Sequence, residues 1–233
     1  MRFAKLSDFR LLGNNAQNRQ FAVIGLGRFG RAVCATLHKM GHDVLGIDSN
    51  EKLVNDALSD EIIAHALMLD ATQPEALKEA GIFEFDVVVV AIGNFIQESI
   101  IVTLNLKENN VKTVIAKAST EIHGRLLAKV GADQVIFPEH EMGCNLAYAL
   151  TRPGILERLN LDADHSIVEV QVPEAFHGQT LEALQLRSRY GVSVLAVGCG
   201  NRFEINPPPT LTLETGKLLV VIGSNAAIEA LPS

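Results

Sequence analysis

Six residues near the start of the chain have the spacing of a loop that binds a diphosphate. They are Gly25-Leu26-Gly27-Arg28-Phe29-Gly30, which satisfy the pattern G-x-G-x-x-G. In such a loop the first glycine permits a tight turn, the second lets the main chain approach the phosphates, and the third lets the next helix pack on the preceding strand. Free amides at the helix start then face the anion. The spacing predicts a nucleotide site.

A carboxylate follows at the distance typical of ribose recognition. Asp48 lies 23 residues after Gly25, at the end of the second apolar run. There it would accept hydrogen bonds from both hydroxyls of an adenosine ribose and repel a 2′-phosphate, which disfavours NADP. We place the next residue, Ser49, in the same pocket. The alternative is a purely structural glycine turn with a capping aspartate.

Arg28 occupies a variable position of the motif, at the mouth of the predicted phosphate turn. A guanidinium there can pair with phosphate oxygens in a forked geometry, which a dinucleotide diphosphate does not require. This favours ATP or ADP over NAD(H). A solvated arginine at a helix start is the alternative, although that position is slightly unfavourable for a cation.

Other candidate residues follow the next strands of the same predicted sheet. Because the carboxyl ends of parallel strands share one edge, these residues should lie near the adenine and the phosphates. Each of these residues alone is common at the end of a strand. The prediction therefore depends on their occurring together at one edge of the sheet. They are Asp70, Ala71, Thr72, Ala91, Gly93 and Lys117.

Short β-branched runs alternate with helical patterns from Gln20 to Phe137. We expect strands over Phe21–Gly25, Val44–Asp48, Ile62–Ala66, Val87–Ile92, Val111–Ala116 and Gln134–Phe137, and helices over Arg28–Met40, Glu51–Ser59, Pro74–Ala80, Ile96–Asn109 and Glu121–Val130. This alternation predicts an α/β fold with a Rossmann-like, doubly wound parallel sheet. Gly41, Gly81 and Gly131 each follow a helical pattern, where a left-handed residue closes a helix.

The remainder of the chain predicts a second, smaller domain. A helix is expected over Glu139–Leu150, and Thr151-Arg152-Pro153-Gly154 breaks it. Beyond the break a small α+β module should contain strands over Ser166–Val172, Val192–Val197, Arg202–Ile205 and Leu218–Ile222 and a helix over Leu181–Arg187. We therefore divide the chain into an N-terminal extension (residues 1–19), a nucleotide domain (20–138), a crossover helix (139–152) and a C-terminal domain (153–233).

Composition narrows the classes of function. Of the 233 residues, 48% are hydrophobic, none is Trp, and the net charge is −7 with no dense basic block, so nucleic-acid binding is not expected. The longest apolar run has the length of a buried strand rather than a membrane span. Three cysteines without metal-ligand spacing fit reduced thiols in a cytosol. The hydrophobic excess is assigned to the buried sheet and to subunit interfaces.

The residues needed for catalysis are sparse. The second domain offers His165, His177 and Cys199, and both histidines fit a surface position better than that of a general base. No P-loop, nucleophile elbow or zinc-protease motif occurs. The sequence therefore favours a nucleotide sensor over an enzyme. The alternative is a small NAD-dependent oxidoreductase; a redox-sensing repressor would need a DNA-binding segment before Gln20 that the sequence lacks.

Nearly the whole chain after residue 19 resembles the cytosolic RCK proteins (regulator of potassium conductance) of the Trk/Ktr potassium-uptake type. The most specific marks are the segments Gln20–Gly30, Gly41–Asp48, Val88–Gly93, Gly131–Glu139 and Met142-Gly143. The resemblance implies dimers that assemble into an octameric ring beneath a membrane potassium-translocating subunit, with ATP or ADP changing the ring shape and so the gate. It also implies that Gly25, Gly27, Arg28, Phe29 and Gly30 line the phosphates, Asp48 the ribose, and Asp70, Thr72 and Lys117 the rest of the pocket.

The resemblance implies two further ligands. Glu139 matches a Pro-Glu pair whose carboxylate helps to hold a divalent cation or sodium near bound ATP; a first-turn glutamate favoured by the helix dipole is the alternative. Cyclic di-AMP would lie between paired C-terminal domains, beside Leu186, Arg187 and Pro209, although Ser193 stands where relatives often carry Asn. The N-terminal extension fits a contact with the channel subunit or lipid, or a frayed tail.

Overall fold

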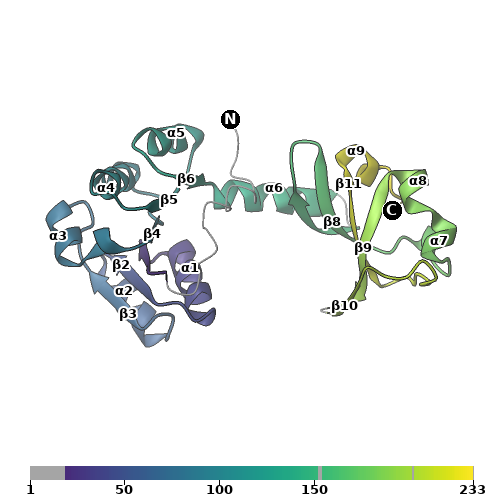
Figure 1. Ribbon diagram of the computed structural model, residues 1–233, viewed down its shortest axis with the longest axis horizontal. Helices are drawn as coiled ribbons and strands as arrows, with labels where there is room; N and C mark the ends of the chain where they lie inside the picture. Colours follow the sequence, from purple (N-terminus) through teal and green to yellow (C-terminus); the bar gives the residue numbers. More distant parts are fainter. Residues whose placement is uncertain (1–18, 152–153, 201, 233) are drawn as a thin grey trace. The chain divides into compact units, whose positions relative to one another are not determined.

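The computed structural model describes residues 19–151, 154–200 and 202–232. The chain forms two compact units, Met1–Glu139 and His140–Ser233 (Figure 1). All but Arg19 of the predicted N-terminal extension lies outside the described residues. No helix in the part of the chain that the structure describes is long and apolar enough to cross a membrane.

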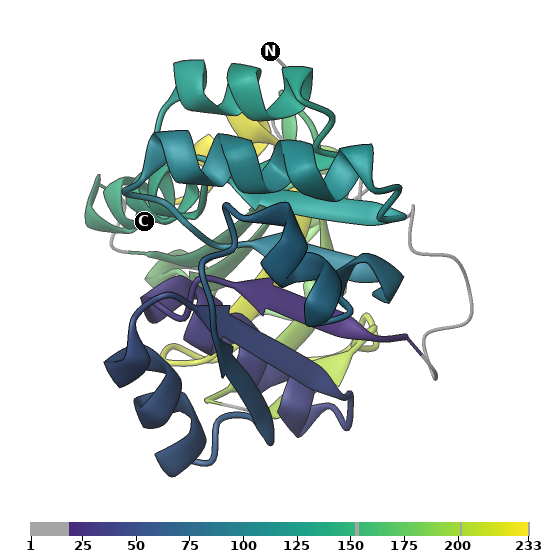
Figure 2. The ribbon, with the colours of Figure 1, turned by 90° about the vertical axis from the view of Figure 1, so that its left-hand side faces the viewer.

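The first unit is a six-stranded parallel sheet in the order β3-β2-β1-β4-β5-β6. Two helices pack on one face and three on the other, and Figure 2 shows α4 and α5 side by side. The predicted doubly wound fold is confirmed. Its elements are β1 (Phe21–Ile24), α1 (Arg28–Lys39), β2 (Val44–Asp48), α2 (Glu51–Ser59), β3 (His65–Met68), α3 (Pro74–Glu79), η3 (Ile82–Glu84), β4 (Val87–Val90), α4 (Ile96–Glu108), β5 (Thr113–Lys117), α5 (Glu121–Lys129) and β6 (Gln134–Ile136).

Burial on both faces explains the central strands. All four valines of β4 are buried, because alternate side chains meet opposite helix layers. The helix ends follow local chemistry: the Asn50 side chain accepts a hydrogen bond from the Lys52 amide at the start of α2, as N-cap residues do. Gly41, Gly81 and Gly131 have φ angles of 86°, 70° and 104°, so the predicted left-handed helix closures are confirmed.

The third strand lies further along the chain than the apolar run predicted. Strand β3 begins at His65 rather than Ile62. Glu61 has φ 52° and the Ile62 amide donates to the Ala57 carbonyl, so this segment still closes α2. Ile63 is buried against Gly46, where an added Cβ would lie 2.4 Å from its Cδ1. The two isoleucines at 62 and 63 are apolar because this segment packs on the core after α2, and they do not pair in the sheet.

The second unit contains a five-stranded antiparallel sheet in the order β10-β9-β11-β8-β7. Its small helices pack on the sheet around a core that includes Phe176, Leu184 and Leu219. The predicted α+β character is confirmed. The elements that follow β6 are α6 (Pro138–Thr151), β7 (Ile155–Asn160), β8 (His165–Gln171), η4 (Glu174–Phe176), α7 (Leu181–Leu184), α8 (Leu186–Tyr190), β9 (Val192–Cys199), β10 (Arg202–Ile205), β11 (Leu218–Ser224) and α9 (Asn225–Glu229).

Three elements of this unit differ from the sequence prediction. Strand β7 was not predicted, because only Ile155 in it is buried and no alternation marks it. The single helix expected over Leu181–Arg187 is broken at Gln185, which has φ 48°. Helix α9 was also not predicted, although Ser224 accepts a hydrogen bond from the Ala227 amide as an N-cap.

Candidate functional site

The glycine loop forms a tight turn directly after β1. Gly25 has φ 102°, and its amide donates to the Ile47 carbonyl at 2.7 Å. A Cβ added at Gly30 would lie 1.8 Å from the carbonyl oxygen of Gly25, so the start of α1 contacts the turn without room for a side chain. A Cβ at Gly27 would meet no atom of the described residues within 4 Å. The first glycine is thus required by its backbone conformation and the third by packing, whereas the second borders open space.

This loop lies at the point where the strand order reverses. Strand β1 pairs with β2 on one side and β4 on the other, and in open α/β sheets the carboxyl edge at such a point is where ligands bind. Gly27 is the N-cap of α1, and no side chain among the described residues caps that helix. The amides of its first turn are therefore available at the carboxyl edge of the sheet, as in an anion site.

The carboxylate of Asp48 ties the glycine loop to the start of α2. Its Oδ2 accepts a hydrogen bond from the Leu26 amide at 2.7 Å, and its Oδ1 accepts one from the Asn50 amide at 2.8 Å. A carboxylate offers about four lone-pair directions. Asp48, half-buried, thus performs the structural role and still has acceptor capacity for two hydroxyls. Ser49 is exposed beside it.

Residues 70–72 form a turn at the same edge. The Leu69 amide donates to the Asp48 carbonyl, which brings the end of β3 beside the end of β2. Asp70 Oδ1 accepts from the amide and the hydroxyl of Thr72 at 3.0 and 2.7 Å, and these bonds lower the pKa of the Asp70 carboxyl. The side chain of Asn105 donates to the Thr72 carbonyl, and Ala71 is buried.

Lys117 joins the ends of β4, β5 and β6. Its side chain is only 11% exposed, and Nζ lies 2.5 Å from Oε1 of Glu139. The same ammonium lies 5.7 Å from the centroid of the Phe29 ring, and a Cβ at Gly93 would meet it at 2.8 Å. The sequence analysis predicted Lys117 and Glu139 as separate site residues, but it did not predict their ion pair. The pairing of Lys117 with Ile136 brings them together.

Glu139, the partner of Lys117 in this ion pair, lies in the first turn of α6. Burial raises the pKa of its carboxyl, but the hydrogen bond from Lys117, a backbone bond and the charges of Lys117 and Arg28 together hold that pKa below its ordinary value. Within the described residues, no group of three or more His, Cys, Asp or Glu could hold a metal ion. The role of Glu139 as a cation ligand stays a prediction.

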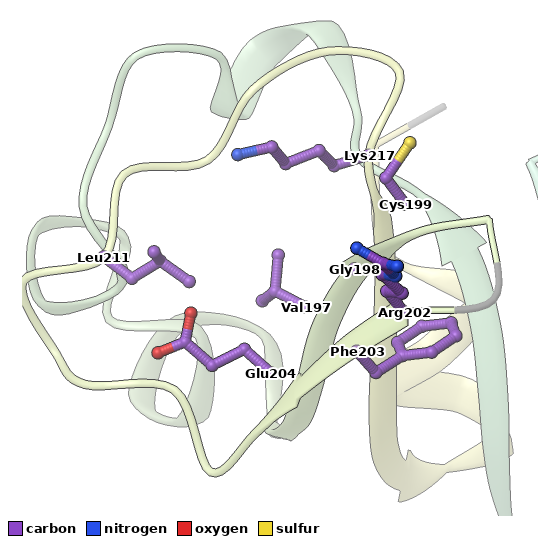
Figure 3. A pocket seen from close by; sticks show the side chains of 8 residues that line it. All are labelled: Val197, Gly198, Cys199, Arg202, Phe203, Glu204, Leu211 and Lys217. Carbon is purple, nitrogen blue, oxygen red and sulfur yellow. The ribbon is translucent and has the colours of Figure 1, made fainter.

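The residues predicted for a cyclic dinucleotide lie in the second unit. Arg187 and Pro209 are exposed, whereas Leu186 belongs to the buried core. The Glu182 amide donates to the Pro209 carbonyl and so joins α7 to the proline segment. A separate hollow of about 320 Å³ also lies in this unit. Figure 3 shows its lining residues, which are Val197, Gly198, Cys199, Arg202, Phe203, Glu204, Leu211 and Lys217. None of the three predicted residues lines it, and their role stays a prediction.

Comparison with known proteins agrees with this architecture. Residues 21–138 match the TrkA-N domain and residues 165–231 the TrkA-C domain. Ktr system potassium uptake protein C of Bacillus subtilis (strain 168) is 38% identical over 206 residues, which cover 88% of this chain and 92% of that protein. Ktr system potassium uptake protein A of Vibrio alginolyticus is also 38% identical over 206 residues, covering 88% and 93%.

A solved structure shows the same fold. The GsuK channel bound to NAD has a TM-score of 0.65 and 17% identity, and the match covers 94% of this chain and 41% of that chain. The resemblance to RCK proteins of the Trk/Ktr type is confirmed by the two domain matches and the Ktr relatives. The chain therefore belongs to the family of TrkA-N and TrkA-C domain proteins that includes the Ktr system potassium uptake proteins.

Proposed function

We propose that this protein is a non-enzymatic, nucleotide-sensing regulatory subunit of a potassium uptake system. The observation that carries the proposal is the edge of the parallel sheet, where an uncapped helix start, a ribose-type carboxylate and two cationic side chains lie together. Its relatives are named for potassium uptake. A nucleotide there would act as a signal, since the site residues provide recognition groups and no nucleophile beside a base.

The ligand we favour is ATP or ADP. Its diphosphate would lie over Gly27 and the first amides of α1, and its ribose hydroxyls would donate to Asp48. Arg28 and Lys117 would bind the terminal phosphates. The adenine would lie toward residues 70–72, and Ala91 would form the floor beneath the turn. NAD(H) fits the same loop and ribose contacts, so the distinction rests on the cations at the phosphate end.

Regulation requires that the ligands differ in their preference for two conformations. ATP would favour one conformation of a ring built from dimers and ADP the other, and the ring would gate a membrane potassium-translocating subunit from the cytoplasmic side. In this arrangement residues 20–138 would bind the nucleotide and residues 139–152 would provide the crossover between the two domains. Residues 153–233 form the C-terminal domain, where Leu186, Arg187 and Pro209 would contact cyclic di-AMP.

A panel of ligands tests this function. A ligand that binds only the native state raises the melting temperature in proportion to the logarithm of its concentration over Kd. We expect ATP and ADP to raise the melting temperature of the full chain more than NADH does at equal concentration. Cyclic di-AMP should act in addition, because its predicted residues lie in the other unit. A response to NADH alone, with turnover of a hydride donor, would instead support an oxidoreductase.

Glu139→Gln distinguishes the two roles of that carboxylate. If Glu139 only holds Lys117 away from phosphates, its neutralisation should tighten ADP binding about threefold without added cations, since the ammonium is freed and an anion is removed. If it also binds a cation beside ATP, the same variant should weaken ATP binding only when magnesium is present. Titration calorimetry with each nucleotide, with and without magnesium, measures both effects. Unchanged affinities in all four titrations would contradict both roles.

A further inference from the structure

A series of buried hydrogen bonds links helices α4 and α5 near the candidate site. His123 is 1% exposed and Ser99 is fully buried. Nε2 of His123 lies 2.7 Å from the hydroxyl of Ser99, whose Oγ lies 2.9 Å from the carbonyl oxygen of Ile96. On the other side of the ring, Nδ1 lies 3.3 Å from both the amide nitrogen and the hydroxyl of Ser119. Two side-chain groups, the Ser99 hydroxyl and the His123 imidazole, thus connect the Ile96 carbonyl to the Ser119 amide.

The directions of these hydrogen bonds follow from the groups at the two ends. A backbone amide only donates, so the Ser119 amide requires an unprotonated Nδ1 on His123. The proton of the neutral ring must then be on Nε2, which donates to Ser99, and the Ser99 hydroxyl donates to the Ile96 carbonyl. Burial lowers the pKa of the His123 imidazole, which agrees with a neutral ring. Every member of the chain has a partner in one arrangement only.

One end of this hydrogen-bond chain is the first residue of α4, and the other lies in the loop between β5 and α5. Ile96 directly follows the loop that contains Gly93, and Ser119 lies two residues after Lys117. Gly93 and Lys117 already meet at the sheet edge, where a Cβ on Gly93 would lie 2.8 Å from Nζ. The buried hydrogen bonds therefore join the first turn of α4, which directly follows the Gly93 loop, to the loop that follows Lys117.

The start of α5 also supports the third loop of this edge. A Cβ added at Gly124 would lie 2.4 Å from Cζ of Phe137, the residue that precedes Pro138 and Glu139. The residue next to His123 thus contacts the segment that leads into α6. One helical turn, residues 121–124, thus contacts Ser99 in the first turn of α4, Ser119 in the loop after Lys117, and Phe137 before Pro138 and Glu139.

We propose that His123 is a positioning residue for the nucleotide site: through Ser99 and Ser119 it holds the β4–α4 and β5–α5 loops in the spacing that Lys117 needs to reach a phosphate. The proposal rests on the proposed nucleotide function. It assigns no contact between His123 and the ligand. Loss of the link should therefore loosen both loops and weaken phosphate binding, even where the fold is kept.

Ser99→Ala tests the link, with Thr103→Val as its matched control. Alanine is a good helix former, so α4 is kept while His123 loses its acceptor. Thr103 is equally buried one turn further on, but its hydroxyl donates only to the Ser99 carbonyl of its own helix. In hydrogen exchange followed by mass spectrometry, we expect Ser99→Ala to speed exchange of segments 91–97 and 117–122. Thr103→Val should affect α4 alone.

Calorimetric titration with ADP supplies the second measurement. Ser99→Ala should bind ADP about fivefold more weakly than the natural chain, which corresponds to one lost hydrogen bond, whereas Thr103→Val should bind it unchanged. Equal exchange and equal affinity in the two variants would overturn the proposal. If the natural chain binds neither ADP nor ATP, the proposed function fails and this role of His123 fails with it. Faster loop exchange in Ser99→Ala would then show only the structural link.

Discussion

Replacing Gly30 with alanine is expected to lower the free energy of unfolding of the first unit by about 3 kcal/mol, which corresponds to a melting temperature lower by about 10 °C. The added Cβ would lie 1.8 Å from the Gly25 carbonyl oxygen and 3.3 Å from the Cβ of Ala91. Because the opposing atom belongs to the backbone, α1 itself must move away from β1. Chemical or thermal unfolding followed by circular dichroism measures the loss.

Gly27→Ala is the matched control. We expect it to weaken nucleotide binding strongly and to leave stability almost unchanged. Its φ of −68° suits alanine, and an added Cβ would meet no atom of the described part of the chain within 4 Å. The free energy of unfolding should therefore change by less than about 1 kcal/mol. Binding of ADP should nevertheless fall about 100-fold, because the methyl group occupies the space where the diphosphate approaches two amides. A Gly27→Ala protein that binds ADP normally would show that the phosphates do not lie on this loop.

The contrast between these two glycines also shows what the sequence could predict. The G-x-G-x-x-G spacing reflects local requirements of a turn, a close approach and a helix contact, so a pattern over six residues is enough to place it. The same holds for Gly41 and Gly131, whose left-handed conformations follow from the helices that they end. Strand β7 lacks a local signal, because its pairing with β8 rather than its own burial determines its conformation.

The ionic and polar contacts of the site depend on residues far apart in the chain. Lys117 meets Glu139 only because β5 pairs with β6, and a lysine and a glutamate 22 positions apart carry no mark of this. His123 is read from the sequence as an ordinary helical residue, yet its ring is buried against Ser99 of the neighbouring helix. Sequence patterns therefore predict which edge of the sheet binds a ligand, while the partners of each side chain require the fold.

Asp48→Asn is expected to weaken ADP binding about 30-fold, the loss of about one charge-assisted hydrogen bond. The substituted side chain keeps its shape but has one acceptor oxygen. Its amide group must face either the Leu26 or the Asn50 amide, both of which donate to the natural carboxylate. The remaining oxygen cannot serve a backbone amide and two ribose hydroxyls equally well. Titration calorimetry with ADP measures the change.

Asp43→Asn is the control for the change of charge, since Asp43 is exposed and precedes the amino-terminal end of β2, whereas Asp48 ends the strand. It should leave the affinity for ADP unaltered. A second comparison separates the ribose contact from the support of the loop. If Asp48 faces the ribose, Asp48→Asn should reduce the preference for NADH over NADPH, because the charge that repels a 2′-phosphate is removed. A lower melting temperature with unchanged preference would mean that Asp48 serves only the turn.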